Sequence, residues 1–256
     1  MMQYFDPNQY LKTITIVGLG GTGANVARIV GRIAYDMQRK RRHAPDILLI
    51  DPDKVEEKNV GRQLFAPCDV GQYKVEVVGK RLNYALGLST RWIPDAVDAQ
   101  QHFDRYGSNL VISCVDNHLA RREIHKISGV AITAGNHSNA GQVVISNSDD
   151  TNLIKRYLDD EKVRYLPKEG LLFPALLEPE PQSAPKPQNL SCAELVATGE
   201  QDLLVNDWMA TIIGQYLYKL LNRQPIHSFL TYINADSMAV RSVPICREEL
   251  EIYLNK

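Results

Sequence analysis

A glycine-rich segment, GLGGTG at 18–23, constrains this chain most. It follows the apolar run TITIV directly and precedes a helical pattern of apolar residues directly. Gly18, Gly20 and Gly23 match G-x-G-x-x-G in the strand-to-helix context that makes the motif credible. The first glycine permits a tight turn, the second lets the backbone approach a phosphate, and the helix N-terminus offers unpaired N–H groups. The segment therefore indicates a nucleotide-binding turn, although the motif alone is weak evidence.

The rest of the first half alternates β-branched runs with helical segments. The runs are TITIV, ILLID, LVISCVD and VAITAG, and the helices are expected near 24–41, 72–86 and 118–128. This alternation is typical of a parallel sheet covered by helices, so the expected fold is α/β, a Rossmann-like, doubly wound and mainly parallel sheet. We place a change of architecture near Gly141, where QVVIS suggests a further strand.

The second half predicts a C-terminal strand and helix extension. Between Phe173 and Ser191 lie five prolines, which exclude regular helix or sheet and favour a crossover or a mobile loop. A strongly apolar helix is expected within 201–223, followed by a hairpin from 228–236 and 238–245 and a last short helix. We expect one domain over 1–256, with a nucleotide-binding core at 12–145 and the crossover, long helix and hairpin at 146–256.

Composition excludes several classes of protein. The content of hydrophobic residues, 44%, supports a real core, and 29 Lys and Arg against 30 Asp and Glu leave a net charge of −1. The net charge therefore gives no overall attraction to nucleic acid or to an anionic membrane. We see no secretory leader and no apolar run near membrane-spanning length, so a cytoplasmic location is expected. Four scattered cysteines without a C-x-x-C pair argue against a disulfide framework and a zinc site.

The residues after the second predicted strand separate ATP from NAD. Asp51 ends that strand, where a carboxylate can accept hydrogen bonds from ribose hydroxyls, although strand-end aspartates are also common helix caps. Beyond it, Arg62 can clamp phosphate oxygens in a bidentate fork and Lys74 can add a compact positive charge. A hydride-transfer enzyme needs no such cluster, whereas triphosphate chemistry does. Solvated charges flanking a loop are the plain alternative.

Four motifs, GLGGTG, DPDKVEEKNVGRQ, DVGQYK and CVDNHLAR, resemble in order and spacing the adenylation core of the ThiF, MoeB and HesA family. These proteins are bacterial relatives of ubiquitin-activating enzymes. The resemblance covers about residues 12 to 145 well and continues more loosely to about 240. NVGRQ, GQVVIS, LLFPAL and SCAEL followed by QDLLVN are similar to the ThiF-related member of the bacterial PRTRC cassette.

The resemblance implies ATP-dependent adenylation of the C-terminal carboxylate of a small ubiquitin-like β-grasp protein, with Mg²⁺, by a homodimer. By position, Asp51 would hold the ribose, Asn59, Arg62 and Lys74 the phosphates, and Asp116 the magnesium ion. The implied nucleotide-binding residues are Gly18, Gly20, Gly21, Gly23, Asp51, Asp53, Asn59, Arg62, Gln63, Lys74, Asp116 and Asn117. The implied catalytic residues are Arg62, Lys74, Asp116 and Cys192.

Two of these residues have plain alternatives. Asp116 follows LVISCV, at the carboxyl end of a buried strand, where doubly wound sheets place ligands; it could instead cap the next helix. Cys192 lies where thioester-forming members of the family carry a thiol in the crossover loop, and it could equally be a packing residue. Of the other thiols, Cys114 and Cys246 are expected in the core, and the exposure of Cys68 is open.

The chain also departs from the family. The paired C-x-x-C zinc ligands are absent, and the first arginine is Arg28, so the N-terminal arginine that reaches the neighbouring subunit's site has no counterpart. Arg105, Arg121 or a partner could replace it, although Arg121 could instead be structural. GNHSNAGQ at 135–142 is expected to line the channel for the substrate tail. The alternatives are a catalytically impaired nucleotide-binding scaffold and, with less support, an NAD-dependent oxidoreductase.

Overall fold

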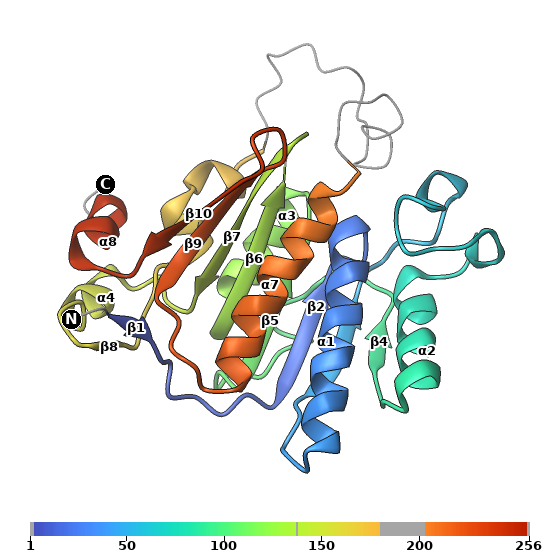
Figure 1. The fold of residues 1–256 in the computed structure, drawn as a ribbon, viewed down its shortest axis with the longest axis horizontal. Coiled ribbons are helices and arrows are strands. Elements are labelled where there is room, and N and C mark those ends of the chain that lie inside the picture. The colour runs from blue at the N-terminus through green and yellow to red at the C-terminus, as the bar shows by residue number, and fades with distance from the viewer. Residues whose placement is uncertain (1–2, 137, 180–202, 255–256) are drawn as a thin grey trace.

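The computed structural model describes residues 3–136, 138–179 and 203–254. Its centre is an eight-stranded sheet with the strand order β10-β9-β7-β6-β5-β2-β3-β4 (Figure 1). The parallel strands are β2 (Thr13–Val17), β3 (Asp46–Ile50), β4 (Arg91–Ile93), β5 (Asn109–Ser113) and β6 (Gly129–Asn136). The antiparallel strands are β7 (Ala140–Ser146), β9 (Ser228–Asn234) and β10 (Ala239–Pro244). The predicted α/β class and mainly parallel sheet are confirmed.

The order of the parallel strands creates a switch point at β2. From β2 the chain moves outward to β3 and β4 on one side, then returns to place β5 and β6 on the other. The loops that leave β2 and β5 therefore diverge from the same edge, and doubly wound sheets bind ligands in the crevice between such loops. The glycine-rich turn and the residues after Ser113 both lie at this edge.

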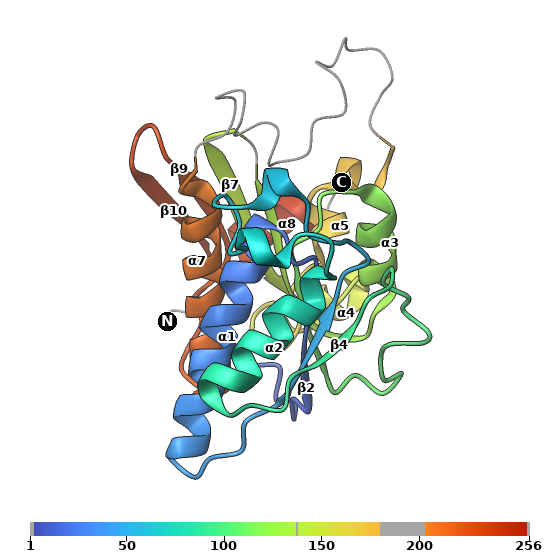
Figure 2. The same cartoon turned by 90° about the vertical axis from the view of Figure 1, so that its right-hand side faces the viewer.

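Helices cover both faces of the sheet. On one face lie α1 (Gly21–Arg39), α2 (Lys74–Leu86) and α7 (Val205–Leu221), and on the other lies α3 (His118–Lys126) (Figures 1 and 2). The apolar residues of α1 recur at helical spacing, and they include Val26, Val30 and Ala34, all buried. The alternating strand residues separate two cores: Ile14 and Ile16 face the α1 side, whereas Val17 and Val111 face the α3 side.

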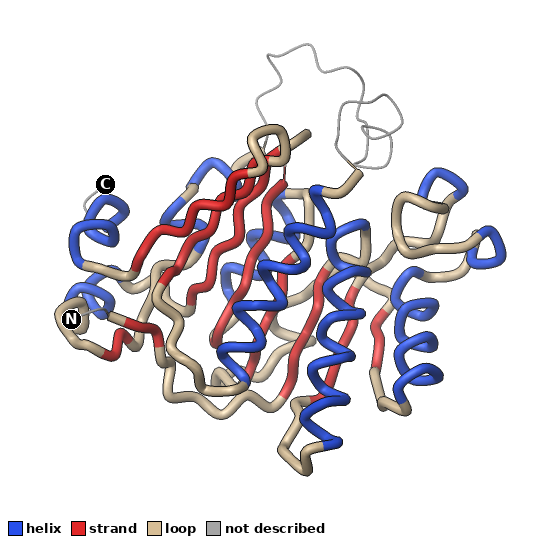
Figure 3. The backbone as a smooth tube through the Cα atoms, viewed as in Figure 1, coloured by secondary structure: helices blue, strands red, loops and turns tan. Residues whose placement is uncertain are grey.

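Shorter elements complete the chain (Figure 3). A small parallel pair joins β1 (Tyr4–Phe5) to β8 (Lys162–Val163). The helices are α4 (Thr151–Arg156), α5 (Glu169–Leu172) and α8 (Arg247–Leu254), with single turns η1 (Glu57–Asn59), η2 (Pro67–Asp69) and η3 (Pro174–Leu177). None of the helices among residues 3–136, 138–179 and 203–254 is both long and apolar enough to span a bilayer.

The sequence predicted the long helix, the β9–β10 hairpin and the final helix, and the structure confirms all three. The short elements β1, α4 and α5 were not predicted. Pro174 begins the η3 turn, so the proline-rich segment is not irregular throughout; most of that segment lies outside the described residues.

The apolar residues of α7 belong to the core of this chain. Gly214 lies so close to α1 that an added Cβ would approach Ile29 to 2.6 Å, and Met209 packs against Gly141 in the same way. The outward residues Thr211 and Gln215 are exposed and polar. Most of the apolar surface of this helix is therefore buried within the chain, whereas Tyr218 is 38% exposed.

Candidate nucleotide-binding site

The glycine turn between β2 and α1 has the geometry that the motif predicts. Gly18 has a φ of +85°, and a Cβ there would lie 2.7 Å from the carbonyl oxygen of Cys114. A Cβ on Gly23 would lie 1.7 Å from the carbonyl oxygen of Gly18, so the turn closes onto the first helical residues. Gly20 is the extended N-cap residue of α1. The unpaired N–H groups at this helix N-terminus suit an anion such as a phosphate.

Asp51 follows β3 and holds the glycine turn. Its side chain is buried, its Oδ2 accepts a hydrogen bond from the N–H of Leu19, and its Oδ1 accepts one from the N–H of Asp53 at 2.8 Å. Burial raises the pKa of the Asp51 carboxyl above its ordinary value, and the nearby Lys74 cation opposes that shift. Each carboxylate oxygen retains a lone pair, so the group can still accept bonds from ribose hydroxyls. Asp51 therefore holds the glycine turn through its bond from Leu19. The N-cap of the next helical turn is Glu56, so the alternative role of Asp51 as a helix cap is wrong.

Lys74 brings a positive charge to the same edge. It is the first residue of α2, it is 7% exposed, and its Nζ lies 2.8 Å from Oδ2 of Asp53. The Asp53 side chain is 63% exposed, so this ion pair opens toward solvent. The backbone N–H of Lys74 also donates to the carbonyl oxygen of Asp53 at 2.9 Å. The Lys74 ammonium group is already buried and oriented, so it can interact with an incoming polyphosphate without moving out of water.

The loop from 56 to 65 supplies polar side chains. Asn59 is buried at the end of η1, and its Oδ1 accepts a hydrogen bond from the N–H of Glu56 at 2.8 Å. Gln63 reaches the glycine turn, because its Nε2 would lie 3.9 Å from a Cβ on Gly20. Within the described parts of the chain, the buried Oε1 of Gln63 has no hydrogen-bond partner. Arg62, between them, is half-buried.

Asp116 and Asn117 have different roles. Asp116 is exposed beyond the end of β5, whereas Asn117 is the N-cap of α3, with its side chain accepting from the N–H of Ala120 at 2.9 Å. The alternative of Asp116 as a helix cap is therefore wrong. Residues 3–136, 138–179 and 203–254 contain no group of three or more His, Cys, Asp or Glu side chains that could hold a metal. A magnesium ion here would rely on Asp116 together with phosphate oxygens and water, which fits the ordinary habit of Mg²⁺.

Arg121 is structural. It is 7% exposed, its Nη1 forms an ion pair with Oε2 of Glu169 at 2.8 Å, and its Nη2 donates to the carbonyl oxygens of Val115 and Ala134. Desolvation raises the pKa of the Glu169 carboxyl, while Arg121 acts in the opposite direction. This pair fixes α3 and α5 to the ends of β5 and β6, so Arg121 is not available to replace the family's N-terminal arginine.

The cysteines divide by environment. Burial raises the pKa of the Cys114 thiol to about 12, which makes it unreactive at neutral pH. Desolvation also raises the pKa of Cys246, whereas Cys68 is exposed after Pro67. Cys192 lies outside the described residues, so its role as a thioester nucleophile stays a prediction.

Sequence reasoning missed the polar residues that connect elements far apart in the chain. Thr22, Asn136 and Asn206 form one hydrogen-bonded group, and Glu169 pairs with Arg121. No spacing rule joins α1 to a residue of α7, since their contact depends on the tertiary fold. Arg121, in the motif CVDNHLAR, was the only member of the Arg121–Glu169 pair that the sequence pattern singled out.

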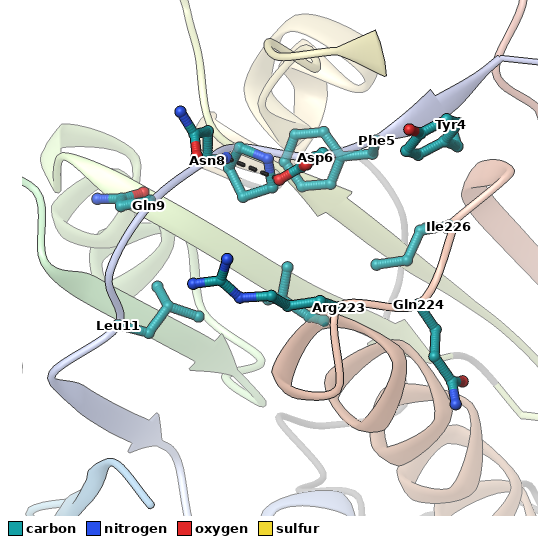
Figure 4. Close-up of a pocket in the computed structure, with 11 residues that line it drawn as sticks. Tyr4, Phe5, Asp6, Asn8, Gln9, Leu11, Arg223, Gln224 and Ile226 are labelled. Atoms are coloured by element: carbon teal, nitrogen blue, oxygen red, sulfur yellow. Dashed lines mark hydrogen bonds between the residues drawn. The ribbon is translucent and has the colours of Figure 1, made fainter. Parts of the chain in front are cut away.

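The other end of the sheet carries a cavity of about 70 Å³ (Figure 4). It is lined by residues 4–9 and by the chain that leaves α7, and Figure 4 shows Arg223 on the side facing Asn8 and Gln9. These residues precede β2 and follow α7, whereas the glycine turn follows β2 and α7 begins beside it. The cavity is therefore remote from the candidate nucleotide-binding site.

Comparisons with known proteins agree with this geometry. A model of the ThiF family matches residues 11–251. The chain is 32% identical over 160 residues to ubiquitin-like modifier-activating enzyme 5 of Branchiostoma floridae, covering 57% of this chain and 35% of that protein. It is 31% identical over 128 residues to the Culex quinquefasciatus enzyme of the same name, covering 44% of this chain and 30% of that protein. The chain thus spans about a third of the length of these curated relatives.

Solved structures show the same fold at low identity. E. coli MccB with ATP is similar with a TM-score of 0.55 and 17% identity, covering 92% of this chain and 64% of that one. A selenomethionine form of PaaA is similar with a TM-score of 0.57 and 16% identity, covering 91% of this chain and 64% of that one. Since the family model extends over nearly the whole chain, and the glycine turn, Asp51 and Lys74 meet at one edge of the sheet, this chain belongs to the ThiF family.

Proposed function

We propose that this chain uses ATP to adenylate the C-terminal carboxylate of a small ubiquitin-like β-grasp protein. The observation that carries the proposal is the placement of Lys74: a buried lysine at the start of α2, ion-paired to Asp53, beside an aspartate that holds the glycine turn. This arrangement combines a cation and helix N–H groups at the edge where doubly wound sheets bind nucleotides. The similarity to ubiquitin-like modifier-activating enzymes and to MccB supports the same chemistry.

In the proposed reaction, a carboxylate oxygen of the substrate attacks the α-phosphorus of ATP. An oxygen–phosphorus bond forms, the bond from the α-phosphorus to the bridging α–β oxygen breaks, and pyrophosphate leaves with the electron pair. Asp51 holds the ribose, and the N–H groups of the glycine turn with Lys74, Arg62 and Asn59 hold the phosphates. Because negative charge grows on the leaving pyrophosphate, fixed cations stabilise the transition state more than the ground state.

Asp116 would hold Mg²⁺, which when bound neutralises phosphate charge. Asp116 fits that role because it is an exposed carboxylate at the carboxyl end of β5, free of the capping role that Asn117 fills. Asp53, Gln63 and Asn117 would contribute further polar contacts to the nucleotide. The hairpin between β6 and β7, within 135–142, would line the channel for the substrate tail.

A second step is proposed at Cys192. Its thiolate would attack the acyl carbon of the adenylate, forming a carbon–sulfur bond and releasing AMP. The test is whether the chain forms an adduct with its substrate that survives denaturation and that a thiol reductant removes. Cys192→Ala should not form this adduct, although pyrophosphate exchange should continue. A homodimer and membership of the PRTRC subgroup remain predictions of the resemblance, and a cytoplasmic location remains a prediction from the sequence pattern.

The experiment that tests the proposal is ATP–pyrophosphate exchange with candidate β-grasp proteins from the same gene neighbourhood. We expect exchange that requires ATP, Mg²⁺ and a free substrate C-terminus. ATP binding without exchange would instead favour the nucleotide-binding scaffold. Tight NAD binding without ATP binding would overturn both.

A further inference from the structure

Asn206 lies where three elements meet beside the glycine turn. It is the second residue of α7 and only 7% exposed. Its Oδ1 accepts hydrogen bonds from Oγ1 of Thr22 at 2.8 Å and from Nδ2 of Asn136 at 2.7 Å. Thr22 belongs to the first turn of α1, and Asn136 is the last residue of β6. Helices α1 and α7 start at the same edge of the sheet and run side by side (Figure 1).

The two bonds to Oδ1 fix the plane of the Asn206 carboxamide and so determine where its N–H groups point. Nδ2 would lie 2.6 Å from a Cβ on Gly21, which means that the amide faces the glycine turn through space that only a glycine leaves open. Among the described residues, no acceptor for Nδ2 is present. Nδ2 is not among the fully buried unpaired atoms of the described residues, so a water molecule can reach it in the free protein and a ligand oxygen can replace that water.

We propose that the Nδ2 group of Asn206 donates a hydrogen bond to the carboxylate that is adenylated, and later to the acyl oxygen of the adenylate. This inference rests on the proposed function. Its partner Thr22 lies on the phosphate-binding turn, and its partner Asn136 lies on the strand that leads into the proposed substrate channel. In the proposed reaction the attacking oxygen would approach the α-phosphorus between these two elements.

A neutral donor suits this position. A cation would stabilise the free carboxylate and reduce its nucleophilicity, whereas an amide N–H orients the oxygen at a smaller cost to its reactivity. In the proposed reaction the helix N–H groups and Lys74 hold the phosphates, which leaves the Asn206 amide for the second substrate. Asn206 would thus be a substrate-binding residue that aligns the acyl group.

The test compares AMP with glycyl sulfamoyl-adenosine, a stable mimic of an acyl-adenylate, by calorimetry. Asn206→Ala removes the amide donor without adding charge, whereas Asn206→Asp would place a negative charge beside the glycine turn. We expect Asn206→Ala to lose at least tenfold affinity for the mimic, with AMP affinity within about twofold of the unaltered protein. Thr22→Val removes one of the two bonds that orient the carboxamide and leaves Nδ2 in place, so it should lose less affinity for the mimic than Asn206→Ala does.

Equal losses for AMP and mimic in Asn206→Ala would mean that the amide contacts the nucleotide or only holds the turn, and would overturn the inference. Unchanged affinity for both would overturn it as well. The proposed function has a separate sign of failure: the unaltered protein would then bind neither ATP nor AMP.

Discussion

Lys74 is the residue on which nucleotide affinity should depend most. Its ammonium group is nearly buried and already oriented by Asp53, so its interaction with phosphate is less screened than that of a surface lysine. We expect Lys74→Ala to weaken ATP binding roughly tenfold or more and to slow pyrophosphate exchange by roughly a hundredfold. Lys80→Ala on the same helix is the matched control, because its side chain is exposed and its Nζ pairs with the half-buried Glu76. Calorimetry that shows equal ATP affinity for both variants would contradict the role of Lys74.

The thiols allow a test by pH. Because burial raises the pKa of Cys114 to about 12, its thiolate fraction at pH 8 is about one in ten thousand, and it grows as the pH rises toward the pKa. We therefore expect iodoacetamide to alkylate the exposed Cys68 at pH 8 and to leave Cys114 unmodified in the folded protein. Peptide mass mapping gives both yields, and unfolding in urea should make Cys114 reactive. Rapid labelling of Cys114 in the folded chain would contradict its raised pKa.

At the residue scale, the sequence predicts candidate site residues better than it predicts their hydrogen-bond partners. The carboxyl end of a parallel strand marks a ligand edge in this fold class, which is why the sequence predicts Asp51 and Asp116 as site residues. The choice between Asp116 and Asn117 as the cap of α3 depends on where the helix begins, and helix ends shift by a residue or two. The contact of Asn206 with Thr22 could not be predicted, because it joins residues 184 positions apart.

At the scale of the elements, the glycines of the turn between β2 and α1 serve different purposes. Gly23 is needed for the backbone to close, whereas Gly20 leaves room beside the turn. A Cβ on Gly23 would meet the carbonyl oxygen of Gly18 at 1.7 Å, whereas a Cβ on Gly20 would have Gln63 as its neighbour at 3.9 Å. We expect Gly23→Ala to lower the free energy of unfolding by about 2–4 kcal/mol, because the backbone of the turn must move. Gly20→Ala should change it by less than about 1 kcal/mol.

Urea unfolding followed by circular dichroism measures both effects. ATP affinity then separates the two functions of the turn: Gly20→Ala should still reduce it, since the second glycine lets the phosphate approach the backbone. A Gly23→Ala protein as stable as the original would contradict the close contact within the turn.

Element types were predicted well where the periodicity was strong, as in α1 and α7. The short elements β1 and α5 carry too few residues for a periodic signal, and their stability comes from tertiary contacts such as the Arg121–Glu169 pair. The apolar character of α7 was evident in the sequence, but the elements that it packs against were not. Amphipathicity weakens when a helix packs against both a sheet and a neighbouring helix, and the closeness of Gly214 to Ile29 shows how tightly α1 covers it.

At the scale of the whole molecule, the alternation of strands and helices determined the fold class, because parallel strands need crossover helices. The order of the strands was not predicted from the sequence. It follows from the direction of each crossover, and it is what brings the glycine turn, Lys74 and the α7 N-terminus to one edge. The antiparallel strands β9 and β10 then extend the sheet beyond β7.

The assembly of the molecule is the last prediction. The family resemblance implies a two-fold homodimer, yet the buried side of α7 packs inside the chain and its outward residues Thr211 and Gln215 are polar and exposed. We therefore expect a dimer whose interface does not include α7. Light scattering at micromolar concentration should give twice the chain mass, both for the unaltered protein and for Gln215→Arg, because a buried charge would disrupt an interface through that helix. A mass of one chain for the unaltered protein would contradict the dimer and exclude an arginine supplied by a second copy. Dissociation by Gln215→Arg alone would instead place α7 at the interface.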